Sequence, residues 1–423
     1  MYHTAVIADD FTSVTDCTMP FACRGLSTAA MLSVPEGDFP QARILGMNTD
    51  SRTVEPKVAY DRNKAAALVL KQAGCTHIYK SVDSTLRGNL GAEIDGVMDG
   101  LELPLALVAP AFPHYGRTTL EGIHYLNGAR LEDSPIARDP ACPATESEIA
   151  KILAAQSGRK SGRLGLDVVR DTTEAFAAAV SRLQAEGCSF IIPDVETEED
   201  LGRVAAHSTA LARCLVVGST GLSRHVAEQW CTDDDTAAVP APQTEQPVIV
   251  AAASVSPVTA GQVERLLEEP GVARCLISPT QAAFGSMEEY AARAEAILKD
   301  GLDLVLQVDS SPEARAQSEQ AAREAGLTRT ETAARIAGAM SALTAELLSA
   351  GLSGAVVMTG GDMAQAVLET FRSPGMELWG EVEPGIPAGR LMGATPCLAV
   401  TKAGAFGTPD ALRTARSILK KTH

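Results

Sequence analysis

Three carboxylates stand close together near the start of the sequence. Asp9 and Asp10 directly follow the apolar run Thr4–Ala8, and Asp16 comes shortly after them. Mutual repulsion makes such a cluster costly unless it binds a ligand or a metal, or takes part in catalysis. A turn that leads into a helix, with Asp or Thr as the N-terminal cap, explains the same residues equally well. The segment alone leaves both interpretations open.

Positively charged side chains follow two further apolar runs. Lys80, Asp83 and Arg87 come after the expected strand 76–79, and Arg52 comes after another such run. An arginine grips a carboxylate through two parallel hydrogen bonds, and an aspartate beside it orients the cations or binds a hydroxyl. Surface salt bridging explains each of these side chains taken singly. Because the polar character recurs after each run, the pattern favours a binding site.

A histidine stands in a loop whose prolines and glycine give it a defined shape. The loop covers residues 110–118 and contains His114. This side chain is a candidate acid or base, but a lone histidine in a loop is more often structural.

The second half of the sequence places small hydroxyl residues and glycines after its apolar runs. Ser254 and Ser256 precede an expected helix, where free N–H groups bind phosphate or the serines merely cap the helix. The paired glycines of 359–362 allow the backbone to approach a ligand closely, and Asp362 either caps the next helix or holds a magnesium-bound water. Lys402, which lies in the segment Thr401–Gly407, is suited to neutralise phosphate charge.

Short apolar runs alternate with alanine-rich helical stretches along the whole chain. This alternation predicts an α/β protein with mainly parallel sheets flanked by helices. Ligands of such sheets lie beyond the carboxyl ends of the strands, which is where the polar residues stand. The expected strands include Thr4–Ala8, Leu105–Ala109, Phe190–Ile192, Leu215–Val217, Val248–Ala252, Leu304–Val308, Ala355–Met358 and Leu398–Val400, and the expected helices include Arg62–Ala73, Thr173–Glu186, Thr259–Glu268, Glu288–Leu298 and Ala364–Phe371.

A polar, proline-containing stretch divides the chain into two expected domains. The stretch 231–247 has three consecutive aspartates and three prolines without apolar periodicity, which is typical of a linker. We therefore predict one domain over residues 1–235, a linker over 236–246 and a second domain over 247–423. The ligand cleft is expected between the two domains.

The charge balance argues against polyanionic partners. The 423 residues include 36 Lys+Arg and 53 Asp+Glu, so the net charge is −17, and nucleic acid and anionic membranes are disfavoured. The first residues lack the pattern of a signal peptide, and the nine cysteines include no C-x-x-C pair. We expect a cytoplasmic protein that binds no nucleic acid and no membrane. Exposed alanine-rich helices favour a homodimer.

The most familiar nucleotide-binding signatures are absent. The sequence has no G-x-x-x-x-G-K-[ST], and no full G-x-G-x-x-G follows an expected strand. The residues by themselves thus indicate a two-domain α/β enzyme whose second half suits phosphate, without naming the reaction.

Taken together, these segments resemble the four-carbon acid sugar kinase family nearly from end to end. Members of this family use ATP to phosphorylate the terminal hydroxyl of threonate, erythronate or 3-oxo-tetronate. The segments that carry the resemblance are Ile7–Thr12 with Asp16, Lys80–Asn89, Pro110–Pro113 with Gly116–Thr118, Gly218–Ser223, Ser254–Gln262, Thr359–Asp362, Gly380–Pro387 and Thr401–Gly407.

The resemblance implies a sugar-acid site in the first domain and a nucleotide site in the second, with ATP and Mg²⁺ as cofactors and no defined metal ligands. Asp9 and Asp10 are the implied catalytic residues. The sugar-acid site would comprise Asp9, Asp10, Arg52, Lys80, Asp83 and Arg87. The nucleotide site would comprise Ser254, Ser256, Thr359, Gly360, Gly361, Asp362 and Gly404.

Two positions depart from the family pattern. The family usually has Gly-Ala where this chain has Ser13-Val14, and Gly where it has Ala253. The first change is expected to alter a turn, and the second puts a methyl group where a phosphate approaches. They leave a non-catalytic binding protein as an alternative. A haloacid-dehalogenase-like phosphohydrolase ranks lower, because its first motif is D-x-D whereas Asp9 and Asp10 are adjacent.

Overall fold

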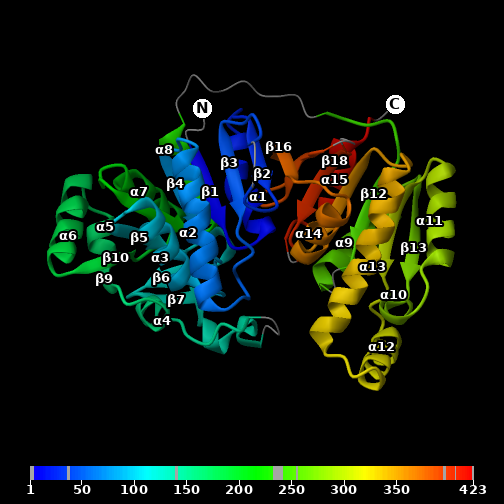
Figure 1. The fold of residues 1–423 in the computed structure, drawn as a ribbon, viewed down its shortest axis with the longest axis horizontal. Coiled ribbons are helices and arrows are strands. Elements are labelled where there is room, and N and C mark those ends of the chain that lie inside the picture. The colour runs from blue at the N-terminus through cyan, green and yellow to red at the C-terminus, as the bar shows by residue number, and fades with distance from the viewer. Residues whose placement is uncertain are drawn as a thin grey trace. The chain divides into compact units, whose positions relative to one another are not determined.

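The fold is that of a computed structural model, which describes residues 4–35, 39–138, 142–231, 242–253, 256–393, 397–404 and 406–421. The chain divides into two compact units, Met1–Ala238 and Val239–His423. Each unit has a mainly parallel sheet flanked by helices (Figure 1). This confirms the α/β fold expected from the sequence.

The N-terminal unit is built on a parallel sheet. Its described strands follow the order β2-β3-β1-β4-β11-β5-β10-β9, and all neighbours are parallel. Helices cover a sheet whose strands are buried on both faces, which explains the nearly continuous apolar runs in the sequence. The strands are β1 (Thr4–Ala8), β2 (Thr28–Met31), β3 (Ile44–Asn48), β4 (His77–Ser81), β5 (Leu105–Ala109), β9 (Lys160–Leu164), β10 (Cys188–Pro193) and β11 (Cys214–Gly218).

Helices connect these strands and pack on them. The longest is α2 (Pro56–Gln72), which begins with a proline in the first turn and packs on α3 (Leu90–Leu101). Gly96 and Gly100 of α3 allow this close approach, because a Cβ atom at Gly96 would lie 2.4 Å from the Tyr60 carbonyl. The others are α1 (Phe11–Ala22), α4 (Ile149–Gln156), α5 (Leu166–Val169), α6 (Thr173–Ala185), α7 (Glu198–Ser208) and α8 (Thr220–Trp230).

A small antiparallel sheet follows β5 in the chain. It consists of β6 (Arg117–Leu120), β7 (Ile123–Leu126) and β8 (Ala129–Arg130). Thr119 of β6 bridges to Val195 just after β10, so the small sheet is attached near the carboxyl end of the large sheet.

The C-terminal unit has a mixed sheet with the order β13-β14-β12-β15-β18-β17-β16. The neighbours from β13 to β18 are parallel, whereas β17 and β16 are antiparallel additions. Its strands are β12 (Val248–Ala252), β13 (Val272–Ile277), β14 (Asp303–Val308), β15 (Ala355–Thr359), β16 (Gly375–Glu381), β17 (Pro387–Leu391) and β18 (Cys397–Lys402). Its helices are α9 (Pro257–Leu267), α10 (Pro279–Phe284), α11 (Glu288–Lys299), α12 (Pro312–Glu324), α13 (Arg329–Ser349), α14 (Gly361–Thr370) and α15 (Ala411–Leu419).

Each unit has a hydrophobic core of its own. One buried cluster includes Val6, Leu107 and Phe176, and another includes Val250, Val357 and Leu412. Part of the expected linker contacts the C-terminal unit, because the N–H of Thr244 donates to the carbonyl of Leu419 at 2.8 Å. Residues 232–241 of the expected linker lie outside the described residues. No helix of the described residues is long and apolar enough to span a bilayer.

Candidate functional site

The candidate sugar-acid residues gather at the carboxyl end of three neighbouring strands. β1 lies between β3 and β4 in register, with Ala8 opposite Asn48 and Ile7 opposite Lys80. Asp9 and Asp10 follow β1, Arg52 follows β3, and Asp83 and Arg87 follow β4. The parallel topology therefore brings together side chains that are far apart in the sequence.

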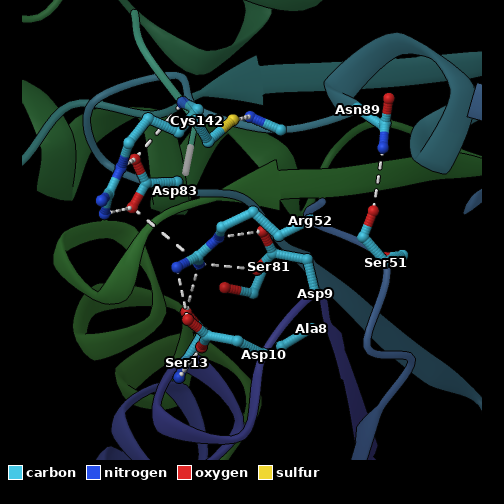
Figure 2. Close-up of polar contacts among 12 residues, drawn as sticks. Ala8, Asp9, Asp10, Ser13, Ser51, Arg52, Ser81, Asp83, Asn89 and Cys142 are labelled. Atoms are coloured by element: carbon cyan, nitrogen blue, oxygen red, sulfur yellow. Dashed lines mark hydrogen bonds and ion pairs between the residues drawn. The ribbon is translucent and has the colours of Figure 1, made fainter. Parts of the chain in front are cut away.

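Arg52 lies at the centre of this cluster and contacts three carboxylates (Figure 2). Its Nε and Nη2 donate to the two oxygens of Asp9 at 2.7 and 3.0 Å. Nη1 pairs with Asp10, and Nη2 lies 3.9 Å from Asp83. Burial acts to lower the pKa of the guanidinium, but the three carboxylates outweigh it and hold the pKa well above its ordinary value. Arg52 is therefore a fixed positive charge.

Asp83 orients a second arginine. The Nε and Nη2 of Arg87 donate to its two oxygens at 2.9 and 2.8 Å, in the bidentate geometry that a guanidinium favours. Burial acts to raise the pKa of Asp83, but Arg87 and Arg52 hold it well below its usual range. Asp83 therefore remains an anion and positions the two arginines. The Arg87 side chain keeps 25% of its surface exposed, more than the 17% of Arg52.

Lys80 lies beneath the cluster. The structure extends β4 to Ser81, so Lys80 is inside a central strand and is fully buried. Its Nζ donates to the carboxylate of Glu93 at 2.7 Å and to the carbonyl of Ser81 at 2.6 Å. Burial raises the pKa of Glu93, although Lys80 acts in the opposite direction. In this geometry Lys80 supports the site from below instead of offering its charge to a ligand.

Glu93 and Ser51 were not among the residues expected from the sequence. The Ser51 hydroxyl donates to Glu93 at 2.9 Å and accepts from the Asn63 side chain at 3.1 Å. Asn89 holds the same segment, because its Nδ2 donates to the Ser51 carbonyl at 2.9 Å. This network links α2, α3 and the loop that carries Arg52. In the sequence Glu93 is one acidic residue among many. Its burial in the first turn of α3 and its pairing with Lys80 become visible only in the fold.

The two adjacent aspartates have different environments. Asp9 is buried, with 2% of its side chain exposed, whereas Asp10 keeps 30% exposed. Asp10 also caps α1, because its Oδ1 accepts from the Ser13 N–H at 2.6 Å. Asp10 therefore both caps the helix and belongs to the charged cluster, so the two interpretations of this segment apply together. Of the two carboxylates, Asp10 is the one within reach of a ligand.

Ser13, the first departure from the family pattern, lies in the first turn of α1. Its hydroxyl accepts a hydrogen bond from Arg52 Nη2 at 3.2 Å. Because the residue is helical, the conformational freedom of a glycine is not needed there. The serine therefore adds a polar contact to the cluster without changing the turn.

The small antiparallel sheet supplies two further residues next to this site. Arg117 interacts electrostatically with Asp83 and Arg87, and its buried Nε has no hydrogen-bond partner among the described residues. His124 is buried, and its ring nitrogens lie 2.9 Å from the Thr119 hydroxyl and 3.0 Å from the Ser84 carbonyl. Arg117 belongs to a motif recognised in the sequence, but its position near Asp83 required the fold. His114 is exposed in the preceding turn.

The residues expected to hold a nucleotide lie at the carboxyl edge of the C-terminal sheet. β12, β15 and β18 are adjacent, with Ala252 opposite Thr359 and Thr359 opposite Lys402. The turns after these three strands therefore meet at one edge. Ser254 lies outside the described residues, and Ser256 is the N-cap residue of α9.

A cavity of about 780 Å³ opens at this edge. Its wall includes Ala253 after β12, Thr359, Gly360 and Asp362 at the end of β15, and apolar residues of α13 such as Ile336. A volume of this size, with a mainly apolar wall and a few polar groups, is typical of small-molecule sites. The second departure from the family pattern, Ala253, thus lies directly on the cavity.

Gly360 gives the turn after β15 its shape. Its φ of 96° is in the region that favours glycine, and its N–H donates to the Lys402 carbonyl at 2.8 Å. Gly361 begins α14, and Asp362 lies exposed in the first turn of that helix. Gly404 lies in the turn after β18, where its carbonyl accepts from the Thr259 hydroxyl at 2.8 Å.

Two family models match the chain, one for each compact unit. The model of a sugar-binding N-terminal domain matches residues 4–226, and the model of a nucleotide-binding C-terminal domain matches residues 249–412. The gap between the two matches, residues 227–248, contains the stretch 231–247.

Relatives whose names state an activity match this chain over almost its whole length. A D-threonate kinase of Salmonella typhimurium is 30% identical and covers 96% of both chains. A D-threonate kinase of Cupriavidus necator is 32% identical, covering 96% of this chain and 95% of the relative. A 3-oxo-tetronate kinase of the same organism is 30% identical, covering 96% and 94%. Similar identity thus accompanies different substrates.

The fold also matches a solved structure from Salmonella typhimurium. The TM-score is 0.86 at 25% sequence identity, with 99% of this chain and 100% of the other covered.

Proposed function

The chain belongs to the four-carbon acid sugar kinase family, and from this premise we propose that it transfers the γ-phosphoryl group of ATP to the terminal hydroxyl of a four-carbon sugar acid. The observation that carries the proposal is the arginine cluster, because a sugar acid differs from an uncharged sugar in the carboxylate that these arginines suit. The candidate acids are threonate, erythronate and 3-oxo-tetronate.

In this proposal the N-terminal cluster binds the sugar acid. Arg87, whose side chain is more exposed than that of Arg52, pairs with the substrate carboxylate, and Arg117 adds positive charge beside it. Asp9 and Asp83 hold the arginines in place. Asp10, the more exposed aspartate, orients the acceptor hydroxyl and accepts its proton late in the transfer. Lys80 and Glu93 keep the loop after β3 in position through Ser51.

The cavity of the C-terminal unit binds the nucleotide in this proposal. The apolar wall on α13 suits the base, and the glycine turn at 360–361 lets the backbone approach the phosphates. Among the described residues, no group of three or more His, Cys, Asp or Glu side chains is arranged to hold a metal ion. In this proposal Mg²⁺ enters as part of the Mg–ATP substrate, and the exposed Asp362 carboxylate is suited to contact its waters.

Phosphoryl transfer demands little covalent chemistry from the protein, so positioning and charge neutralisation carry most of the catalysis. The residues of this chain meet that demand with fixed charges. Arg52 keeps its charge because Asp10, Asp9 and Asp83 outweigh burial and hold its pKa above the ordinary value. Asp83 keeps its charge because Arg87 and Arg52 outweigh burial and hold its pKa below the usual range.

A coupled assay of ADP release tests the proposal. The purified chain is given Mg–ATP and each of the candidate acids in both stereochemical series, with threitol and erythritol as uncharged controls. We expect one acid to be turned over far faster than the polyols. Equal rates with an acid and its polyol contradict the role of the arginine cluster, and nucleotide binding without turnover of any acid supports the non-catalytic alternative.

An assay of phosphate release decides on the phosphohydrolase alternative, because such an enzyme transfers the phosphoryl group to water and needs no sugar acid. In that class the roles would fall to Asp9, Thr359, Asp362 and Lys402. Phosphate release in the absence of any sugar acid would support this alternative.

A further inference from the structure

The turn after β18 is held by its backbone carbonyls. Lys402, the last residue of the strand, directs its Nζ back under the turn and donates to the carbonyls of Ala403, Gly404 and Phe406 at 3.0, 3.3 and 3.2 Å. The lysine is buried, with 2% of its surface exposed. Its ammonium group therefore serves the turn from inside the protein.

Helix α9 supplies two more side chains to the same carbonyls. The Thr259 hydroxyl donates to Gly404 at 2.8 Å and accepts from Lys402 Nζ at 3.2 Å. The Gln262 side-chain nitrogen lies 3.1, 3.3 and 2.8 Å from the carbonyls of Phe406, Gly407 and Thr408. Lys402, Thr259 and Gln262 together form what we call the carbonyl clamp.

The clamp is not a salt bridge. Among the described residues, no carboxylate lies within ion-pair distance of Lys402, and Glu383 instead accepts from the N–H and hydroxyl of Thr408 at 2.7 and 2.6 Å. Burying a charge without a counter-ion is costly. Burial indeed lowers the pKa of Lys402 to about 8, while Glu383 acts in the opposite direction. The free-energy cost of burying this charge indicates that the conformation of the turn is important.

The peptide plane fixes what this arrangement does to the other side of the turn. In a trans peptide the C=O and the following N–H point in opposite directions. The carbonyls of Ala403 and Phe406 point at Lys402, so the N–H groups of Gly404 and Gly407 point away from it. Gly407 has a φ of 88°, and a Cβ atom there would lie 2.7 Å from Ala411, so the turn is built around this glycine.

We propose that Lys402, Thr259 and Gln262 are positioning residues that turn inward the carbonyls of Ala403, Gly404, Phe406, Gly407 and Thr408. They thereby aim the N–H groups of Gly404 and Gly407 at the phosphates of the nucleotide. The inference rests on the proposed function, since it presupposes a nucleotide at this edge. The turn is adjacent to Gly360, whose N–H donates to the Lys402 carbonyl. Lys402 thus acts on the nucleotide through the backbone and does not touch it.

Thr259→Val tests the clamp with little change in volume. The variant removes the donor to Gly404 and the acceptor of Lys402, whereas Thr259→Ser retains both. We expect the dissociation constant of Mg–ADP, measured by calorimetry on the full chain, to rise about tenfold in Thr259→Val and to stay near wild type in Thr259→Ser. The KM for the sugar acid should change little in either. Thr344→Val, whose buried hydroxyl donates to Met340 within α13, is the matched control for a lost threonine.

Lys402→Met tests the charged residue of the carbonyl clamp. We expect Mg–ADP affinity to fall by about tenfold to a hundredfold, because the lost hydrogen bonds are charge-assisted. Lys420→Met is its control, since Lys420 pairs with Asp303 at 2.6 Å at the opposite end of the sheet strands. Should Lys402→Met fail to fold, the Thr259 variants still decide. Wild-type affinity in Thr259→Val overturns the clamp, whereas absence of nucleotide binding in the wild-type chain overturns the proposed function itself.

Discussion

Arg52 shows how a single residue sets the character of a site. Its guanidinium contacts Asp9, Asp10 and Asp83, which come from two different strand ends. A buried arginine would be costly alone, but the three carboxylates stabilise its charged form. Arg52 and Asp83 therefore keep fixed charges over the physiological pH range.

Replacing Arg87 tests the charge that we propose to bind the substrate carboxylate. Arg87→Ala removes the bidentate partner of Asp83 together with its positive charge. We expect kcat/KM for the sugar acid to fall about tenfold to a hundredfold, because a charge-assisted contact is worth about 1.5–3 kcal/mol. Nucleotide affinity should be nearly unchanged. Arg203→Ala, which breaks an exposed pair with Glu199, is the control and should leave both quantities intact.

The two adjacent aspartates have separable roles that Asn substitution distinguishes. Asp10→Asn keeps the shape of the side chain and removes its charge, so we expect kcat to fall roughly 10²–10⁴-fold, as for loss of a general base, with little change in melting temperature. Asp9→Asn weakens the buried pair with Arg52 and should raise KM more than it lowers kcat. Steady-state kinetics and thermal melting measure both effects.

If both Asn variants keep wild-type kcat, the base is another residue. Asp83 does not suit this role, since its pKa lies well below the usual range and it remains an anion that orients arginines. His114 would then be the next candidate to substitute.

At the scale of the element, the expected positions of the strands were confirmed more closely than the lengths of the helices. Thr4–Ala8 and Val248–Ala252 agree with the structure in both bounds, because continuous apolar runs ended by polar residues are typical of buried parallel strands. The expected strand 76–79 lies at His77–Ser81 instead. This shift places Lys80 inside the strand and explains why it is buried. The sequence shows that the residue is charged but does not show its burial. Helix α2 begins at Pro56 and not at Arg62, since a proline fits the first turn.

Contacts between elements could not be predicted from the sequence. The pairing of Lys80 with Glu93 joins β4 to α3, and the carbonyl clamp joins β18 to α9. The antiparallel pair β16 and β17 was not expected from the sequence. For residues that pair with distant parts of the chain, no local sequence pattern predicts the pairing. Glycines and charged residues that directly follow a strand do indicate a candidate site.

The small antiparallel sheet makes a pH-dependent contribution to stability through His124. Burial lowers the pKa of this histidine from the ordinary 6.5 to about 4. The unfolded chain therefore binds more protons between these values, so the free energy of unfolding falls as pH drops from about 6.5 to 4, by up to about 3 kcal/mol. His124→Gln should lower stability at neutral pH and flatten this slope. Chemical denaturation at several pH values measures it.

An unchanged slope in His124→Gln would show that other groups dominate acid destabilisation.

At the scale of the whole molecule, each unit has its own sheet, hydrophobic core and candidate binding site. The two family models divide the chain in the same way. A homodimer, expected from the alanine-rich helices, stays a prediction that light scattering of the purified chain would decide.

The separate cores predict that the C-terminal unit folds by itself and binds nucleotide. The fragment should begin at Val239 and not at residue 247, because Thr244 has hydrogen bonds of 2.8 and 3.0 Å with Leu419, the last residue of α15, and with Lys421. The cavity of about 780 Å³ is lined entirely by residues of this unit, from Ala253 to Met363. We therefore expect the fragment to melt cooperatively and to bind Mg–ADP with an affinity close to that of the full chain, by circular dichroism and calorimetry. The fragment Met1–Ala238 is the matched control and should bind no nucleotide. A folded C-terminal fragment that fails to bind, while the full chain binds, would mean that the N-terminal unit completes the nucleotide site.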